Sequence, residues 1–260
     1  MNRNDEYIQS MSRIKLSDDK KQQMIKDLSE VSPIRKEGTM KKKMGVRKTV
    51  IIAAACVMIF GITAAATGVV TNVVSHNRPD TRTSDLADLE KMEDKTGLDL
   101  TAVESFSNGY KFDYMEVEES TTQDDDFNDV DSYSGVCMEY KKDGAADLSI
   151  YADPSEFAGF DNYEDYLDHR TYKGVEIYYS YDEYLSIPTS EKDTLTDEEL
   201  ERDANDPHFF ISDGSDKRET NFISHVLFTI DGVSYDILAI DTDMTSAEMM
   251  DMAQEIIDAR

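Results

Sequence analysis

The sequence predicts an α+β protein with one transmembrane helix, followed by a mostly antiparallel sheet domain with N- and C-terminal helices packed on it. Three observations predict this fold. Residues 50–74 contain no charged side chain, strand-like segments joined by tight turns follow residue 110, and an amphipathic helix closes the chain. Helices at both ends of a run of hairpin-linked strands are typical of the α+β class.

The uncharged segment has the length of a membrane span. At about 1.5 Å per residue, 25 residues cross a hydrocarbon core of roughly 30 Å with some tilt. Residues 1–48 hold 13 Lys and Arg against 7 Asp and Glu, a net charge of +6, whereas residues 75–260 hold 14 against 48, a net charge of −34. Because basic flanks stay in the cytoplasm, we expect a single-pass protein of the cell membrane with its N terminus inside and its C terminus outside.

A cleaved signal peptide is the alternative to a retained anchor. Residues 51–62 could be its apolar region and Ala64-Ala65-Ala66 its cleavage site. Against it, the basic region before the apolar segment would be about 48 residues long, whereas a whole signal peptide has about 15–30. The anchor is therefore the favoured interpretation.

The chain then divides into four parts: a cytoplasmic segment (1–48), the transmembrane helix (49–74), a flexible polar linker (75–84) and an extracytoplasmic α+β domain (85–260). The outer domain has enough apolar residues to fold, so its acidity indicates a solvated surface. Such a surface repels nucleic acid, and we expect no direct nucleic-acid binding. Cys137 is the only cysteine outside the span, which favours a buried thiol over an intermolecular disulfide.

The cytoplasmic segment carries two short sets of apolar residues at helical spacing. Helices this short are marginal in water, which indicates a partner protein or the membrane surface, although an inert tail explains the pattern equally well. The basic run at 41–48 suits lipid headgroups. Small residues four apart in the span, Gly61 with Ala65 and Ala64 with Gly68, permit a homodimer, but a plain anchor is the simpler interpretation. The candidate partner-binding residues are Tyr7, Ile8, Met11, Met24, Ile25 and Leu28.

The outer domain begins with a helix that Ser84 caps and Gly97 ends. Period-two alternation then predicts a strand at 110–117, followed by an acidic loop at 119–132. We expect further strands at 136–140, 148–151 and 175–181, the first two as a hairpin around Asp143-Gly144.

The clearest hairpin joins residues 222–230 to 233–240 through Asp231-Gly232, a pair that supplies the positive φ angles of a tight turn. We expect it at the centre of the sheet. Thr245 to Glu248 form a capping box that opens the last helix. Its apolar stripe predicts packing on the sheet: Met249, Met252, Ala253, Ile256 and Ile257.

No known catalytic pattern is present. Asp124, Asp126 and Asn128 have the spacing of the first calcium-loop ligands, but Asp129 stands where the turn needs Gly and Gly135 where a bidentate Glu is needed. The four histidines lack metal-ligand spacing. We therefore predict no catalytic, metal or cofactor-binding residue and no enzymatic activity. Seven tyrosines at 163–184 could form a ligand platform, but strand packing is favoured, with Tyr179 and Tyr181 in the core.

Several segments resemble the outer domains of membrane-bound sigma-factor regulators (anti-sigma-factor-like proteins) of clostridia and their relatives. They are Lys95-Thr96-Gly97-Leu98, residues 106–112, Ile187-Pro188, residues 210–216 and the ending 244–257. The resemblance implies an inner segment that holds a sigma factor, one span and an outer domain. The inner segment lacks the cysteines of a zinc-type anti-sigma domain, so no residue role is transferred from that family.

These observations lead to two functional predictions. The first is a non-enzymatic signalling protein, anti-sigma-factor-like, whose outer domain senses an envelope condition and whose inner helices hold a sigma factor or another cytoplasmic transcription regulator. The second is a membrane-anchored extracytoplasmic binding module for a peptide, glycan or cation, with no transcriptional role.

Overall fold

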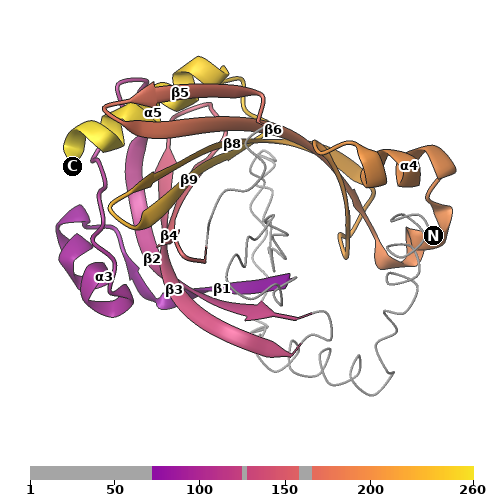
Figure 1. Cartoon of the computed structure of the whole chain (residues 1–260), viewed down its shortest axis with the longest axis horizontal. Helices are drawn as coiled ribbons and strands as arrows, with labels where there is room; N and C mark the ends of the chain where they lie inside the picture. Colours follow the sequence, from indigo (N-terminus) through magenta and orange to yellow (C-terminus); the bar gives the residue numbers. More distant parts are fainter. Residues whose placement is uncertain (1–71, 125–127, 158–165) are drawn as a thin grey trace, which may run out of the picture. The chain divides into compact units, whose positions relative to one another are not determined.

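The computed structural model describes residues 72–124, 128–157 and 166–260, which form a mostly antiparallel nine-stranded sheet with few helices. Neighbouring strands follow the order β1-β2-β3-β4-β9-β8-β6-β5, and β7 pairs in parallel with β6. The sheet is curved, and α3 and α5 lie against its outer, convex side (Figure 1). This arrangement confirms an α+β domain with N- and C-terminal helices on one side of the sheet.

The elements have the following bounds. The strands are β1 (Asn72–Thr83), β2 (Lys111–Gln123), β3 (Asp129–Lys141), β4 (Leu148–Pro154), β5 (Asp168–Tyr172), β6 (Val175–Ile187), β7 (Phe209–Asp213), β8 (Glu219–Ile230) and β9 (Val233–Ile240). The helices are η1 (Leu86–Asp88), α3 (Leu89–Thr96), η3 (Thr189–Thr194), α4 (Asp197–Asn205) and α5 (Ser246–Ala259).

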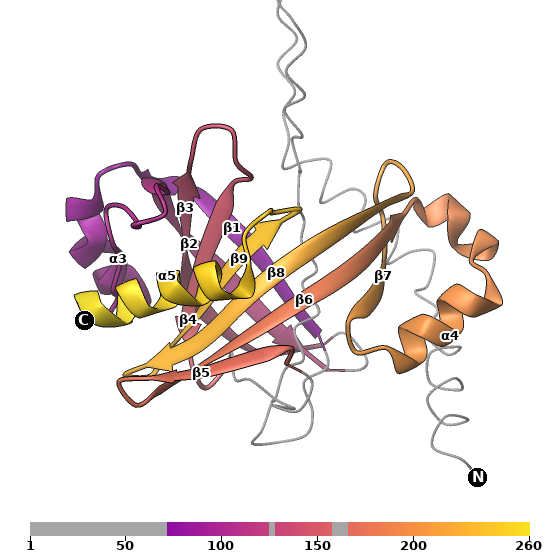
Figure 2. The same cartoon turned by 90° about the horizontal axis from the view of Figure 1, so that it is seen from above.

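The main core lies between the helices and the convex face of the sheet. α5 crosses the strands (Figure 2) and buries the predicted stripe, including Met249 and Ile256, together with Met250. Met92 of α3 joins the same core, and Gly97 ends that helix with a φ of 75°. Thr245 and Glu248 form the predicted capping box.

The hairpin prediction around Asp231-Gly232 is confirmed. The two residues have φ angles of 48° and 84°, which suit a tight turn between β8 and β9. These strands have β4 on one side and β6 on the other, so the hairpin lies in the middle of the sheet as predicted. The hairpin of β3 and β4 around Asp143-Gly144 and the strand from Val175 are also present.

The predicted flexible linker at 75–84 is wrong. Residues 72–83 form β1, an edge strand that pairs antiparallel with β2, so the last three residues of the predicted span (49–74) also belong to the domain. The segment is polar because alternate side chains meet a polar side of β2: Ser75 bonds Ser120 at 2.7 Å, and Asn77 bonds Glu116 at 3.0 Å. Polarity here reflects strand pairing and not a tether.

The predicted acidic loop at 119–132 is also wrong. β2 runs to Gln123 and β3 begins at Asp129, so most of this segment is one long hairpin. Ser120 and Thr122 are buried, with 1% and 2% of their surface exposed. A polar residue on a strand need not face solvent when the whole face of the sheet is polar.

The rest of the predicted membrane span lies outside the described residues. No helix in the described part of the chain has the length and apolar character needed to cross a membrane.

One region of the domain carries elements that the sequence did not predict, namely η3, α4 and β7 beside the end of β6 (Figure 2). Leu185, Ile187 and Phe209 form a second, smaller core there.

Candidate functional site

The concave side of the sheet is lined with polar and ionisable side chains. Because side chains alternate along a strand, the residues between the core positions point away from α3 and α5. We call this side the polar face. Buried or half-buried ionisable groups from six strands lie on it: Glu116, Glu118, Cys137, Glu139, Asp153, Asp182, His225 and Asp236.

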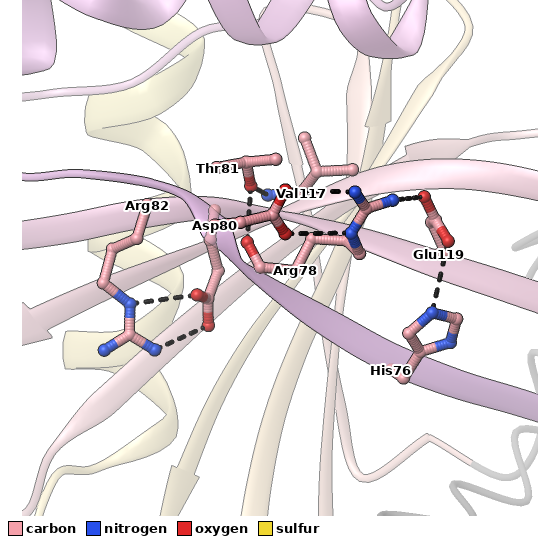
Figure 3. A network of polar contacts seen from close by, with 8 residues as sticks. His76, Arg78, Asp80, Thr81, Arg82, Val117 and Glu119 are labelled. Atoms are coloured by element: carbon pink, nitrogen blue, oxygen red, sulfur yellow. Dashed lines mark hydrogen bonds and ion pairs between the residues drawn. The ribbon is translucent and has the colours of Figure 1, made fainter. Parts of the chain in front are cut away.

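Glu116 is fully buried, with 0% exposure, and its charge is matched. Arg82 of β1 binds both carboxylate oxygens, with Nε donating at 2.9 Å and an η nitrogen at 3.0 Å (Figure 3). Asn77 adds a third donor at 3.0 Å. The guanidinium of Arg82 also lies 4.0 Å from the centre of the Tyr114 ring, a cation–π contact. A bidentate pair of this kind fixes geometry as well as charge.

A second group of contacts holds β1 where its register with β2 shifts, between Arg78 and Thr83. Thr81 Oγ1 accepts from the backbone N–H of Val117 at 2.9 Å and donates to the carbonyl of Arg78 at 2.7 Å. Arg78 pairs with Asp80 and Glu119, and His76 lies 3.2 Å from Glu119 (Figure 3). Side chains thus supply contacts at the bulge, where the ladder is interrupted.

Two aspartates on the polar face are paired with histidines. Asp236 lies 3.0 Å from Nδ1 of His225, and Asp182 accepts from Ser180 and lies 2.7 Å from Nδ1 of His208. Burial lowers the pKa of His225, but the charge and hydrogen bond of Asp236 outweigh it, so the pKa is raised. The raised pKa favours the charged form of the His225 imidazole, whose charge is matched by Asp236.

Glu139 and Cys137 form a third group, on β3. Ser149 donates to Glu139 at 2.7 Å, and the Cys137 sulfur lies 3.6 Å from the same carboxylate oxygen. Cys137 is 0% exposed, which confirms the predicted buried thiol. Burial raises the pKa of the thiol, so it stays protonated and is a poor nucleophile.

Glu118 and Asp153 differ from the other carboxylates because neither has a donor within the described residues. Glu118 is 7% exposed; burial first, and then the charges of Asp153 and Glu116, raise its pKa to about 8. Asp153 is half-buried as a residue, but its Oδ1 is fully buried and has no hydrogen-bond partner. Burial and the charge of Asp236 raise its pKa to about 7. An unpaired buried acceptor costs roughly 1–3 kcal/mol.

Gly135 explains how these two carboxylates come together. It pairs with Glu118 across β2 and β3, and its neighbour Val136 pairs with Ala152, next to Asp153. A Cβ at Gly135 would overlap Oδ1 of Asp153 and would lie 2.8 Å from the backbone oxygen of Ala152. Glycine is therefore needed here for close approach, and no β3 side chain separates Glu118 from Asp153.

Glu118 and Asp153 give the polar face groups that can take up and release protons. Carboxyl groups with pKa values of about 7 and 8 exchange protons near neutral pH, and perturbed groups of this kind mark candidate functional sites. Among the described residues, no three His, Cys, Asp or Glu side chains are placed to hold a metal ion. Because Glu118 and Asp153 have no donor among the described residues, their oxygens can accept hydrogen bonds from a ligand.

A shallow depression beside α4 is a weaker candidate. Glu183, Glu199, Arg202 and Phe209 line part of it. Arg202 already pairs with Glu183 at 2.8 Å and with Asp206 at 3.0 Å, and its guanidinium lies 4.1 Å from the centre of the Phe209 ring. Its cation is thus already engaged within the fold.

The candidate partner-binding residues predicted from sequence all lie outside the described residues: Tyr7, Ile8, Met11, Met24, Ile25 and Leu28.

Among the tyrosines, Tyr179 is in the core as predicted, but Tyr181 is 40% exposed, and its ring stacks on that of Phe222 with 5.4 Å between the ring centres. Tyr181 is excluded from the core because α5 covers only the other end of β6. Its ring instead packs against its neighbour on β8.

Sequence reasoning missed the carboxylates of the polar face. The alternation Met115-Glu116-Val117-Glu118 predicts the strand correctly, but the glutamates of such a strand were expected to face solvent. The one available signal was Gly135 within an otherwise regular strand, which indicates a bulge or a close approach. No family model, curated protein or solved structure matches the chain.

Proposed function

We propose that the chain is a single-pass membrane signalling protein of the anti-sigma-factor-like kind, in which an extracytoplasmic domain with a ligand-binding polar face controls a cytoplasmic transcription regulator. The opposite charges on the two sides of an uncharged segment support this topology, with +6 in residues 1–48 and −34 in residues 75–260. The domain contributes a sensor, the uncharged segment an anchor, and residues 1–48 the contact with the regulator.

One observation carries the proposal. β1 begins at Asn72, immediately after the uncharged residues 50–71, and it is bonded into the sheet along β2. A change in the outer domain can therefore reach the anchor without passing through a slack linker. A domain attached only for localisation needs no such connection.

The test is a transcriptional reporter in cells that carry the full chain or a chain lacking residues 1–31. The proposal expects the regulator to be held by the full chain and released by the deletion, with the outer domain still present at the cell surface. It also expects residues 1–48 to capture a sigma factor or another transcription regulator. An unchanged reporter together with no captured regulator would refute the signalling role.

The second candidate function is an extracytoplasmic binding module without a transcriptional role. The unpaired Glu118 and Asp153 support a ligand site on the polar face, which a binding module needs as much as a sensor does. The reporter separates the two. Ligand binding with no response to the deletion supports the module, and ligand binding with a response supports signalling.

A further inference from the structure

Glu118 and Asp153 stand out when all the buried carboxylates of the polar face are compared. Glu116 has Arg82 and Asn77, and Glu139 has Ser149 as a donor. Asp182 and Asp236 have histidine partners. In the described part of the chain only Glu118 and Asp153 lack a donor among these six carboxylates. Buried polar groups in native proteins are almost always satisfied, so this pair calls for donors from outside the described residues.

The surroundings of the pair define what it can accept. Carboxylates offer only acceptors when ionised, and the backbone of Gly135 leaves no side chain between them. Tyr133 lies close to both carboxyl groups: burial first, and then the charges of Asp153 and Glu118, raise the pKa of its hydroxyl. Its ring stacks on that of Phe157, with 4.8 Å between the ring centres. The site therefore combines two carboxyl groups with an aromatic surface at its side.

A metal ion suits this site poorly. Calcium takes six to eight oxygen ligands, whereas the described residues place only two unpaired carboxylates here. An ammonium group carries a positive charge, three donors and no acceptor, and its alkyl stem can lie along an aromatic ring. Its N–H donors can supply the hydrogen bonds that Glu118 and Asp153 lack among the described residues.

We propose that Glu118 and Asp153 form a binding site for a primary ammonium group, supplied by a polyamine or by a lysine side chain of a basic peptide. The strongly acidic outer domain, with a net charge of −34 in residues 75–260, attracts such ligands over a distance. The inference names the ligand class of the polar face and in that sense rests on the proposed function. Binding itself does not depend on the membrane topology.

Binding must compete with protons. The ammonium group binds the ionised carboxylates, so affinity rises with pH and binding releases protons into the buffer. The charged and titratable groups facing the pair are Glu116, Tyr133, Cys137 and Asp236, contributed by β2, β3 and β9. Arg82 is already engaged by Glu116 and so leaves the pair unmatched.

The experiment is isothermal titration calorimetry of the full-length chain in a neutral detergent, with spermidine and trilysine as separate probes. We expect one site per chain at pH 8, weaker binding at pH 6, and a binding heat that changes with the ionisation enthalpy of the buffer. Glu118→Gln and Asp153→Asn should each weaken binding at least about tenfold. Glu104→Gln, which alters an exposed glutamate elsewhere in the domain, should leave the affinity unchanged.

The two probes distinguish the sources of the ammonium group. Binding of spermidine alone indicates a small amine, binding of trilysine alone a basic peptide, and binding of both the ammonium group itself. Circular dichroism verifies that each variant is folded. The inference is overturned if neither probe binds, or if Glu118→Gln and Asp153→Asn bind as tightly as Glu104→Gln. Loss of binding with an intact reporter response would overturn this site alone and leave the signalling role standing.

Discussion

Replacing Glu118 by Gln should change how stability depends on pH. The carboxyl group has a pKa of about 8 in the folded domain, raised by burial and by the charges of Asp153 and Glu116, against 4.5 when it is free. A raised pKa means that the folded state holds the proton more tightly than the unfolded state. The stabilising contribution of Glu118 is therefore fully present below pH 4.5 and is lost as the pH rises to 8.

The magnitude follows from the two pKa values. At about 1.4 kcal/mol per pKa unit, the whole change corresponds to roughly 5 kcal/mol at high pH. Between pH 5 and pH 8 the wild-type chain should lose on the order of 3 kcal/mol through this group. Glu118→Gln abolishes that loss because an amide does not titrate, while Asp153 still contributes in the same direction. The free energy of unfolding of the variant should therefore rise relative to that of the wild type as the pH rises.

The assay is urea denaturation of both chains between pH 5 and pH 8, followed by circular dichroism because the protein has no tryptophan. The difference in midpoint between variant and wild type should grow by roughly 1–2 M urea over this range. Glu104→Gln, at an exposed position, serves as the matched control and should follow the wild type. If the midpoint difference is the same at pH 5 and pH 8, Glu118 titrates normally in the folded domain and the reasoning is refuted.

Three further predictions concern the same face of the sheet. Gly135→Ala should lower the free energy of unfolding by about 1–3 kcal/mol in urea titrations, because the new methyl group overlaps Asp153; an unchanged midpoint would contradict this packing. Arg82→Met should cost about 3 kcal/mol by leaving Glu116 buried without its partner, and adding Glu116→Gln should restore most of it in a double-mutant cycle. In a Cys56→Ala background, Cys137 should react with a thiol reagent only after unfolding; rapid reaction of the folded chain would show that the thiol is accessible.

The parts of the fold that were predicted correctly depend on short-range signals. Asp231-Gly232 requires positive φ angles, and the stripe from Met249 to Ile257 has the spacing of a helix with one buried face. Both signals involve neighbours in sequence. They predict the local structure independently of how the distant parts of the domain fold.

The errors arise where the environment comes from distant segments. The sequence 119–132 is acidic and polar, which favours a loop in isolation. Its first part, 119–123, nevertheless belongs to β2 and is hydrogen-bonded to β1 on one side and to β3 on the other. Similarly, Ser75 and Asn77 look like linker residues until Ser120 and Glu116 are placed opposite them. The unpaired state of Glu118 depends on Gly135 and Asp153, 17 and 35 positions further along the chain, and no local pattern contains it.

The position of Glu118 gives the two proposals a common physical basis. Its strand partner on β1 is Asn77, and its neighbours Glu116 and Glu119 are the residues that hold Arg82 and Arg78 of β1. Under the two proposals, a ligand at Glu118 acts on the pair of β1 and β2, and β1 directly follows the uncharged segment in the sequence. Residues 50–71 would span about 33 Å as a helix, close to the roughly 30 Å of a hydrocarbon core, so little slack remains before β1. Under the proposed topology, one hydrogen-bonded strand pair separates the ligand from the membrane, and a shift of β1 against β2 is the shortest route by which binding outside could be transmitted inside.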